Sequence, residues 1–230
     1  MQFDENDLMA MDAVSRSIVS LVPLVFPQSI SIEDIVLTRV CCSEADMDES
    51  MLDQLVEVIH KCMGKLYVKH KGKNWREEKL DELTEPGLVF TWYKCGNDLA
   101  AFIAFKLVEE LYGKTLYLYE IQVLPKYQGK HLGTDLMKYF HRMALVVDAA
   151  STDSKVPYHA ILTTKATSLT VFSDNVKAFA WYTRMGYIPS PDCSVDRKLR
   201  GGKVVKPSFY LLTRPIESPD IDDVENDNML

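Results

Sequence analysis

The sequence predicts a mixed α+β protein in which helices cover a central sheet. Two observations support this class. Runs of β-branched and aromatic residues with the length of strands alternate with segments whose apolar residues recur at helical spacing. Apolar residues also make up 47% of the 230 residues, which is enough for one sizeable core. The expected order is strand, helix, helix, several strands, helix, strand, helix and strand, as in a layered fold.

One domain is expected between two less regular ends. We place an N-terminal extension at residues 1–30, the folded domain at 31–214 and an acidic tail at 215–230. The tail holds six carboxylates and no basic residue, so it is interpreted as a disordered solubilising segment or as a contact for a basic partner. The chain has a net charge of −7, most of it from this tail. The nearly neutral remainder does not indicate a nucleic-acid-binding protein.

Composition argues against several other classes. No apolar run approaches the length of about 20 residues that a membrane helix needs. The first residues are acidic, unlike a targeting signal, so we expect a cytoplasmic and nuclear protein. The five cysteines include no C-x-x-C pair, which favours reduced structural thiols and predicts neither a disulfide framework nor a metal site.

The first half of the chain predicts a short helix, a strand, two further helices and then a hairpin. Residues 13–25 can form a short helix that prolines limit, and residues 32–41 form a first strand. Asp46 or Asp48 can cap a helix that Gly64 ends, followed by a loop and a second helix over residues 67–83. Strands at 88–93 and 99–108 are joined through Gly-Asn-Asp, and residues 109–114 form the next turn.

Residues 116–137 contain the most informative stretch of the chain. An alternating strand that carries Glu120 breaks at Pro125, passes through a glycine-containing loop and enters an amphipathic helix. The apolar stripe of that helix consists of Leu132, Leu136, Phe140, Met143 and Val147. A strand, a basic glycine loop and a helix N-terminus together form an anion site. Neither the dinucleotide nor the triphosphate fingerprint fits this loop.

The remaining chain predicts a strand, a helix and two final strands. A polar connection at 148–157 leads to a strand that ends near residue 172. Asp174 or Asn175 then caps a helix that Gly186 terminates. The last two strands are expected at 187–189 and 208–213.

Two motifs in the correct order identify a resemblance. Residues 128–133, Gln-Gly-Lys-His-Leu-Gly, match Q/R-x-x-G-x-G/A except that His131 occupies the first glycine position. Asn175, Ala178, Tyr182, Gly186 and Tyr187 match a second pattern. At these positions the chain resembles the GNAT acyltransferase superfamily. The resemblance implies a three-layer αβα sandwich with a central mixed sheet, and acetyl-CoA as the co-substrate without a metal.

A narrower resemblance covers residues 62–214. The segments YLYEIQV, SLTVFSDNVKAFAWY, SFYLLTR and KLYVKHKGKNWREEK are similar to the NatD type of N-terminal acetyltransferase. That family acetylates the α-amino group of histone tails that begin Ser-Gly-Arg-Gly, in histones 4 and 2A. It implies a histone tail as partner, no nucleic acid or membrane partner, and action without an obligate auxiliary subunit. The connection at 148–168 is longer than this family's.

The GNAT resemblance assigns a set of cofactor-binding residues. The expected backbone and side-chain contacts to acetyl-CoA come from Ile121, Gln122, Val123, Gln128, Gly129, Lys130, His131, Leu132, Gly133, Thr134 and Asn175. The first three lie where the family polarises the thioester carbonyl and holds the pantetheine arm.

Two residues are candidates for proton transfer. An α-amine must lose a proton before it attacks a thioester, and Glu120 is the strand carboxylate that can accept that proton, directly or through water. Tyr182 stands where related enzymes place a phenol near the leaving sulfur, so it is either a general acid or a packing residue.

The NatD resemblance also assigns the substrate pocket. Its expected residues are Tyr67, Trp75, Glu109, Glu110, Tyr117, Tyr119, Thr170 and Phe209. Aromatic walls with hydroxyl groups suit a small N-terminal serine. Glu109 or Glu110 is expected to pair with the substrate arginine, since Val108 stands nearest the family's aspartate. Phe209 replaces a family tyrosine, whose hydroxyl contact could move to Tyr210.

Two other functions remain open from the sequence. The protein could be a GNAT enzyme that acts on a lysine side chain or a small amine. It could also be a non-catalytic module that binds acetyl-CoA or histone tails.

Overall fold

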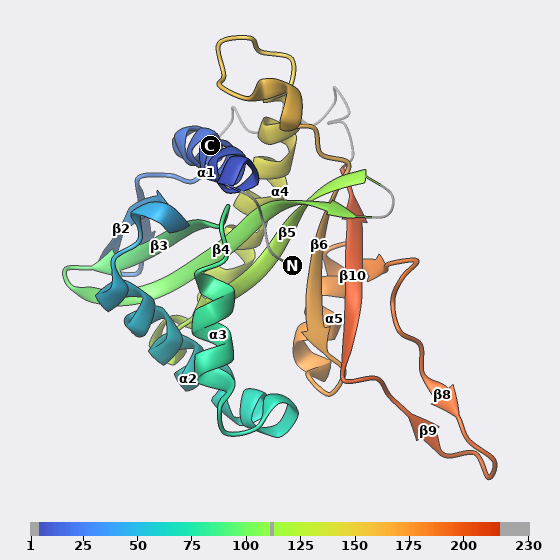
Figure 1. Cartoon of the computed structure of the whole chain (residues 1–230). Helices are drawn as coiled ribbons and strands as arrows, with labels where there is room; N and C mark the ends of the chain where they lie inside the picture. Colours follow the sequence, from blue (N-terminus) through green and yellow to red (C-terminus); the bar gives the residue numbers. More distant parts are fainter. Residues whose placement is uncertain (1–4, 111–112, 217–230) are drawn as a thin grey trace, which may run out of the picture.

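The computed structural model describes residues 5–110 and 113–216, and these form a central sheet between two layers of helices (Figure 1). The strand order in the eight-stranded sheet is β1-β2-β3-β4-β5-β6-β10-β7. Neighbouring strands are antiparallel except β5 and β6, which are parallel. Among the described residues, no helix is both long and apolar enough to cross a membrane.

The strands fall into one large sheet and one small hairpin. The large sheet contains β1 (Ser29–Ile32), β2 (Ile35–Ser43), β3 (Val89–Cys95), β4 (Asp98–Glu110), β5 (Gly113–Val123), β6 (Ala166–Phe172), β7 (Ile188–Pro189) and β10 (Phe209–Pro215). The hairpin pairs β8 (Arg197–Lys198) with β9 (Val204–Val205).

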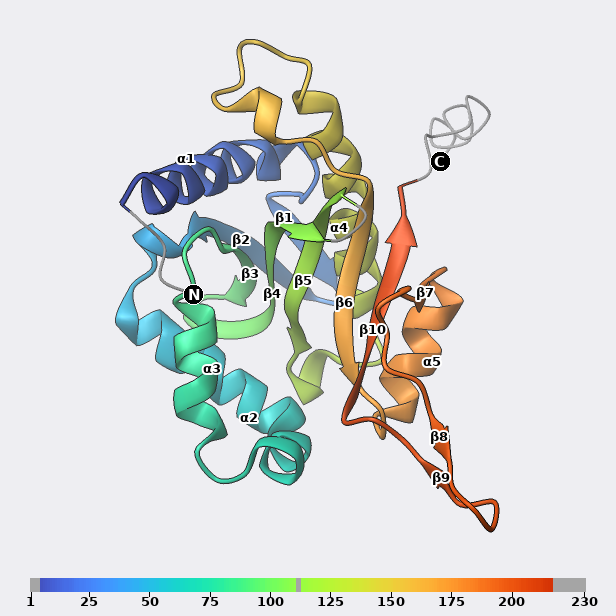
Figure 2. The ribbon, with the colours of Figure 1, turned by 45° about the vertical axis from the view of Figure 1, so that its right-hand side comes forward.

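The helices pack on both faces of the sheet. They are α1 (Glu5–Leu21), α2 (Glu49–Lys71), α3 (Trp75–Leu83), α4 (Leu132–Ala150) and α5 (Val176–Arg184), with short 3₁₀ turns at Val22–Leu24, Glu44–Asp46, Pro125–Tyr127 and His159–Ile161. Helices α2 and α3 cover one face and pack on Phe90, Phe102 and Ala104. Helices α1, α4 and α5 cover the other, on a larger core (Figure 2).

The order of elements agrees with the sequence prediction, but two boundaries do not. Helix α2 continues through Gly64 to Lys71, because Gly64 lies in a helical turn and Gly72, with a positive φ, ends the helix eight residues later. Asp48 caps its start through Ser50 N and Met51 N. The first predicted strand is a β1–β2 hairpin that runs to Ser43.

The N-terminal region contributes to the core of the domain. Ile18, Val22 and Phe26 are fully buried in the same cluster as α4 and the sheet. The acidic residues of the expected tail, from Glu217 onward, lie outside the described residues.

Candidate active site

The candidate site lies where the two parallel strands separate. Strands β5 and β6 are in register only from Thr115 and Ala166 to Leu118 and Leu169, although β5 continues to Val123 and β6 to Phe172. A cavity of about 850 Å³ opens between the two free ends and is lined from both strands. This volume is within the usual range for small-molecule and cofactor sites.

A β-bulge at Tyr119 directs the polar residues of β5 into this cavity. Ala104 pairs with Glu120 and Phe105 pairs with Leu118, so Tyr119 is an extra residue in β5. Consecutive strand residues normally point to opposite faces. The bulge shifts this alternation, so that Tyr119 packs toward α2 and α3 while Glu120 bonds to side chains of the same two helices.

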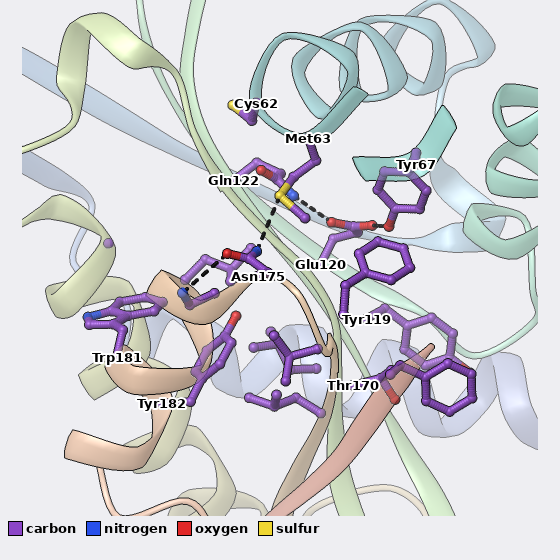
Figure 3. A pocket seen from close by; sticks show the side chains of 18 of the residues that line it. Cys62, Met63, Tyr67, Tyr119, Glu120, Gln122, Thr170, Asn175, Trp181 and Tyr182 are labelled. Atoms are coloured by element: carbon purple, nitrogen blue, oxygen red, sulfur yellow. Dashed lines mark hydrogen bonds between the residues drawn. The ribbon is translucent and has the colours of Figure 1, made fainter. Parts of the chain in front are cut away.

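Glu120 is buried and receives donors on both of its carboxylate oxygens. Tyr67 Oη donates to Oε1 at 2.6 Å, and Gln122 Nε2 donates to Oε2 at 2.8 Å. Figure 3 shows both side chains directed at the Glu120 carboxylate. Burial and the neighbouring carboxylate raise the pKa of Tyr67, so it remains a donor at neutral pH.

Lys79 of α3 is a third partner of Glu120 and was not predicted from the sequence. Its Nζ lies 2.8 Å from Glu120 Oε1, and both side chains are only 4% exposed. Burial alone lowers the pKa of Lys79, but Glu120, Tyr67 and Glu82 together raise it above its usual value. Lys79 shares a helix face with the buried Trp75 and Leu83 at four-residue spacing, which was the available signal.

Trp75 supports the pocket from behind. It is buried, stacks on Tyr67 with a centroid distance of 4.8 Å and does not line the cavity. The Tyr67 ring also meets Phe172 edge to face at 5.3 Å. These contacts hold the Tyr67 hydroxyl against Glu120.

The carboxylates that line the cavity beyond Glu120 are Glu82 and Glu85 of α3 and the loop after it. Glu82 contacts Lys79 Nζ at 2.6 Å, and Glu85 Oε2 accepts from Tyr119 Oη at 3.0 Å. Sequence reasoning missed both, because no local pattern shows that α3 ends beside β5. Glu109 is exposed and does not line the cavity. Glu110, which lies outside the lining too, accepts from Ser168 Oγ at 2.8 Å.

The other predicted substrate residues gather at the same end of the cavity. Tyr117 Oη and Thr170 Oγ1 are 2.5 Å apart and connect β5 with β6 across the cleft. Tyr117 and Tyr119 meet edge to face at 5.1 Å. Phe209, at the start of β10, completes this end of the lining and is 48% exposed.

Asn175 and Tyr182 come from α5 at the opposite side of the cavity. Asn175 caps α5 by accepting from Ala178 N at 3.3 Å, and it also lines the cavity. The Tyr182 hydroxyl points into the cavity in Figure 3 and bonds to no other described residue. Burial raises the pKa of Tyr182, so the phenol is protonated at neutral pH.

The loop before α4 leaves the helix N-terminus open. Gly129 and His131 both have left-handed backbone angles, with φ of 73° and 63°. No side chain caps α4, and the first helical bond of its backbone runs from Asp135 N to His131 O at 3.0 Å. The N–H groups of Leu132, Gly133 and Thr134 therefore have no partner within the described residues, and this arrangement suits a phosphate.

The residues of this loop, 128–134, lie in different environments. Gln128 and Gly133 line the cavity, and Gln128 Nε2 donates to Val123 O at 2.8 Å. Lys130 instead pairs with Glu33 at 2.6 Å, and Leu132 is buried in the core. The other predicted cofactor residues of the loop, Gly129, His131 and Thr134, are outside the lining, while Ile121, Gln122 and Val123 of β5 lie within it.

Comparison with known proteins agrees with this geometry. Residues 52–146 match the acetyltransferase (GNAT) family. The N-alpha-acetyltransferase 40 of Saccharomyces cerevisiae is 30% identical over 183 residues, which cover 69% of this chain and 61% of the yeast protein. The chain therefore spans less than two thirds of the length of this curated relative.

Solved structures share the fold at low sequence identity. PH1933 from Pyrococcus horikoshii is 14% identical with a TM-score of 0.51, covering 78% of this chain and 99% of that one. An acyl-CoA N-acyltransferase from Pseudomonas aeruginosa is 15% identical with a TM-score of 0.50, covering 77% and 99%. The expected three-layer acyltransferase fold is thus confirmed.

Proposed function

From the GNAT acetyltransferase domain that this chain contains, we propose that the protein is an acetyl-CoA-dependent N-terminal α-amino acetyltransferase. We propose that its substrates are histone tails that begin Ser-Gly-Arg-Gly. The observation that carries the proposal is the buried Glu120 in a cavity that also holds an open helix N-terminus and the Tyr182 phenol.

The cavity fits acetyl-CoA in its donors and in its shape. The free N–H groups at the start of α4 suit the pyrophosphate. The unpaired edge of β5 beyond Leu118 offers backbone groups to the amides of a pantetheine arm, since β6 has separated from it there. Acetyl-CoA would supply the acetyl group as an activated thioester.

Glu120 and Tyr182 supply the proton transfers. Glu120 accepts a proton from the α-amine through Oε2, where Gln122 is its hydrogen-bond partner among the described residues. The amine nitrogen then forms a bond to the acetyl carbon as the carbon–sulfur bond breaks. Tyr182 gives its proton to the departing sulfur, because a protonated phenol is available on that side of the cavity.

The other end of the cavity supports selection of a peptide with an N-terminal serine and a cationic third residue. Tyr117, Tyr119 and Thr170 offer hydroxyl groups to the serine end of a peptide. Glu82 and Glu85 add negative charge there, and each has one carboxylate oxygen without a hydrogen-bond donor among the described residues. Such oxygens suit a guanidinium group. We also propose action without an obligate auxiliary subunit, as the NatD resemblance implies.

The experiment compares wild type with Glu120→Gln, using labelled acetyl-CoA and a Ser-Gly-Arg-Gly peptide with a free or a blocked α-amine. We expect kcat to fall about 100-fold or more in the variant, as for loss of a general base, with acetyl-CoA affinity unchanged by calorimetry. Equal labelling of the two peptides would contradict the α-amine assignment. A peptide with a blocked α-amine and an internal lysine tests the side-chain alternative.

A further inference from the structure

The β8–β9 hairpin is a projecting, positively charged element that the acetyl-transfer site does not use. Figures 1 and 2 show it extending away from the body in both views. Its turn is closed by Leu199 N to Lys203 O at 2.8 Å, with left-handed glycines at 201 and 202. Tyr210 Oη anchors its base by donating to Asp196 Oδ1 at 2.5 Å. We call residues 197–206 the basic hairpin.

The basic hairpin carries a local positive charge that the net charge of the whole chain does not reveal. It holds five of the chain's 26 Lys and Arg residues and no Asp or Glu, whereas the whole chain has a net charge of −7. The five are Arg197, Lys198, Arg200, Lys203 and Lys206, and all are exposed. Within the described part of the chain none of them forms an ion pair, although Lys69, Lys79 and Lys130 all do.

The charges point to both faces of a narrow ribbon. Arg197 and Lys198 are consecutive residues of β8, so their side chains lie on opposite faces. Arg200 and Lys203 flank the two glycines of the turn. A flat anionic surface, such as a membrane, could contact only one of these faces. A groove with a phosphate wall on either side could contact both.

We propose that the basic hairpin binds duplex DNA by entering the major groove and contacting its phosphates. The B-form major groove is about 12 Å wide and admits a two-stranded β-ribbon. The major groove of duplex RNA is too deep and narrow for this. Val204 and Val205 of β9 pair with Lys198 and Arg197 of β8 and carry no hydrogen-bonding side-chain groups. We therefore propose a contact with the phosphates that is electrostatic and independent of base sequence. The proposal does not depend on acetyl transfer.

The test measures binding of the full chain to a fluorescein-labelled DNA duplex of about 20 base pairs by anisotropy, across a salt series beginning near 50 mM KCl. We expect micromolar affinity at low salt. Five phosphate contacts limit the slope of log K against log salt to about −4.5, since each contributes about −0.9. Changing all five basic residues to Gln should weaken binding at least about tenfold and flatten the slope.

A charge-matched control separates the hairpin from general electrostatics. Lys61, Lys65, Lys138, Lys155 and Lys165 are exposed and lie elsewhere. Changing these five to Gln alters net charge equally and should leave DNA affinity within about twofold. Equal losses in both variants would overturn the proposal, as would no binding by wild type. Tighter binding to an RNA duplex, or to phosphatidylserine vesicles, would also overturn it. Thermal melting of each variant verifies folding.

Discussion

At the scale of single residues, the site is defined by a buried ion pair. Lys79 and Glu120 lie 2.8 Å apart and are nearly inaccessible to solvent. Removing one member of such a pair leaves an uncompensated buried charge and typically lowers the free energy of unfolding by about 3–5 kcal/mol. The pair therefore does more than orient Glu120, because Lys79 also supplies the positive charge that compensates a buried carboxylate.

Replacing Lys79 with Met should slow the reaction. Without Lys79 the buried carboxylate loses one of the contacts that fix its position, so kcat/KM should fall about tenfold or more. Lys79→Arg keeps the charge and should retain most of the activity. The measurement is kcat and KM of wild type and both variants at neutral pH.

A double variant separates this role from a purely structural one. Lys79→Met should lower the free energy of unfolding by about 3 kcal/mol, and adding Glu120→Gln should restore much of it while activity stays lost. If Lys79→Met lowered stability but left kcat/KM at the wild-type level, the role of Lys79 in holding the carboxylate for catalysis would be wrong.

The sequence could predict Glu120 but not Lys79. Glu120 is the one charged residue of the segment 116–123, LYLYEIQV, and that contrast is visible in the sequence. The pairing of Lys79 depends on α3 docking beside β5, forty-one residues later in the chain. The same is true of Glu82 and Glu85. Docking is a property of the packed molecule, so the local pattern could not reveal these partners.

At the scale of elements, the loop before α4 depends on His131 taking a conformation that favours glycine. Its φ is 63°, where a residue with a Cβ is strained by about 1 kcal/mol. The family pattern has glycine at this position, and His131 adopts a left-handed backbone conformation that favours glycine. The backbone therefore keeps the anion-binding geometry while it stores a small amount of strain.

Replacing His131 with Gly should relieve that strain. We expect the free energy of unfolding to change by only a few tenths to about 1 kcal/mol in the stabilising direction, with acetyl-CoA affinity retained. His131→Val should do the opposite, because β-branched residues resist positive φ most strongly. Chemical denaturation and calorimetry with acetyl-CoA measure the two effects. A loss of affinity in His131→Gly would show that the imidazole itself contacts the cofactor.

The bulge in β5 was not readable from the sequence either. Alternation along residues 116–123 predicts a regular strand, in which Tyr119 and Glu120 would face opposite sides of the sheet. The observed register shift between Ala104 and Phe105 of β4 arises from pairing with another strand. The order of strands and helices along the chain could be predicted because each element depends on local periodicity. The directions in which the side chains of the site point could not be predicted, because they depend on this pairing.

At the scale of the whole molecule, the domain is one packed unit that includes its N-terminal helix. Residues of α1 and the turn after it enter the core with α4, so the first 30 residues contribute apolar surface that the rest of the fold buries. The sequence showed only a short proline-limited helix there, because its contacts with α4 are made across more than a hundred residues. The β8–β9 hairpin was missed because two-residue strands carry no periodic signal.

The stability of the whole molecule should depend on pH through His141 of α4. Its imidazole lies 3.2 Å from Tyr187 Oη, and burial together with the Arg214 charge lowers the pKa of His141 to about 4. An unfolded histidine titrates near 6.5. As the pH falls through this window, the unfolded chain takes up a proton that the folded chain excludes, and stability declines by up to about 3 kcal/mol.

His141→Gln removes this dependence and gives the measurement a reference. The amide loses part of the packing against Tyr187, so the variant should be less stable than wild type at pH 7. That difference should shrink as the pH approaches 4.5, because wild type alone carries the cost of a histidine that must stay neutral. Urea unfolding at several pH values measures it. The two proteins share all other titratable groups. Parallel curves of unfolding free energy against pH would therefore mean that folding does not lower the pKa of His141.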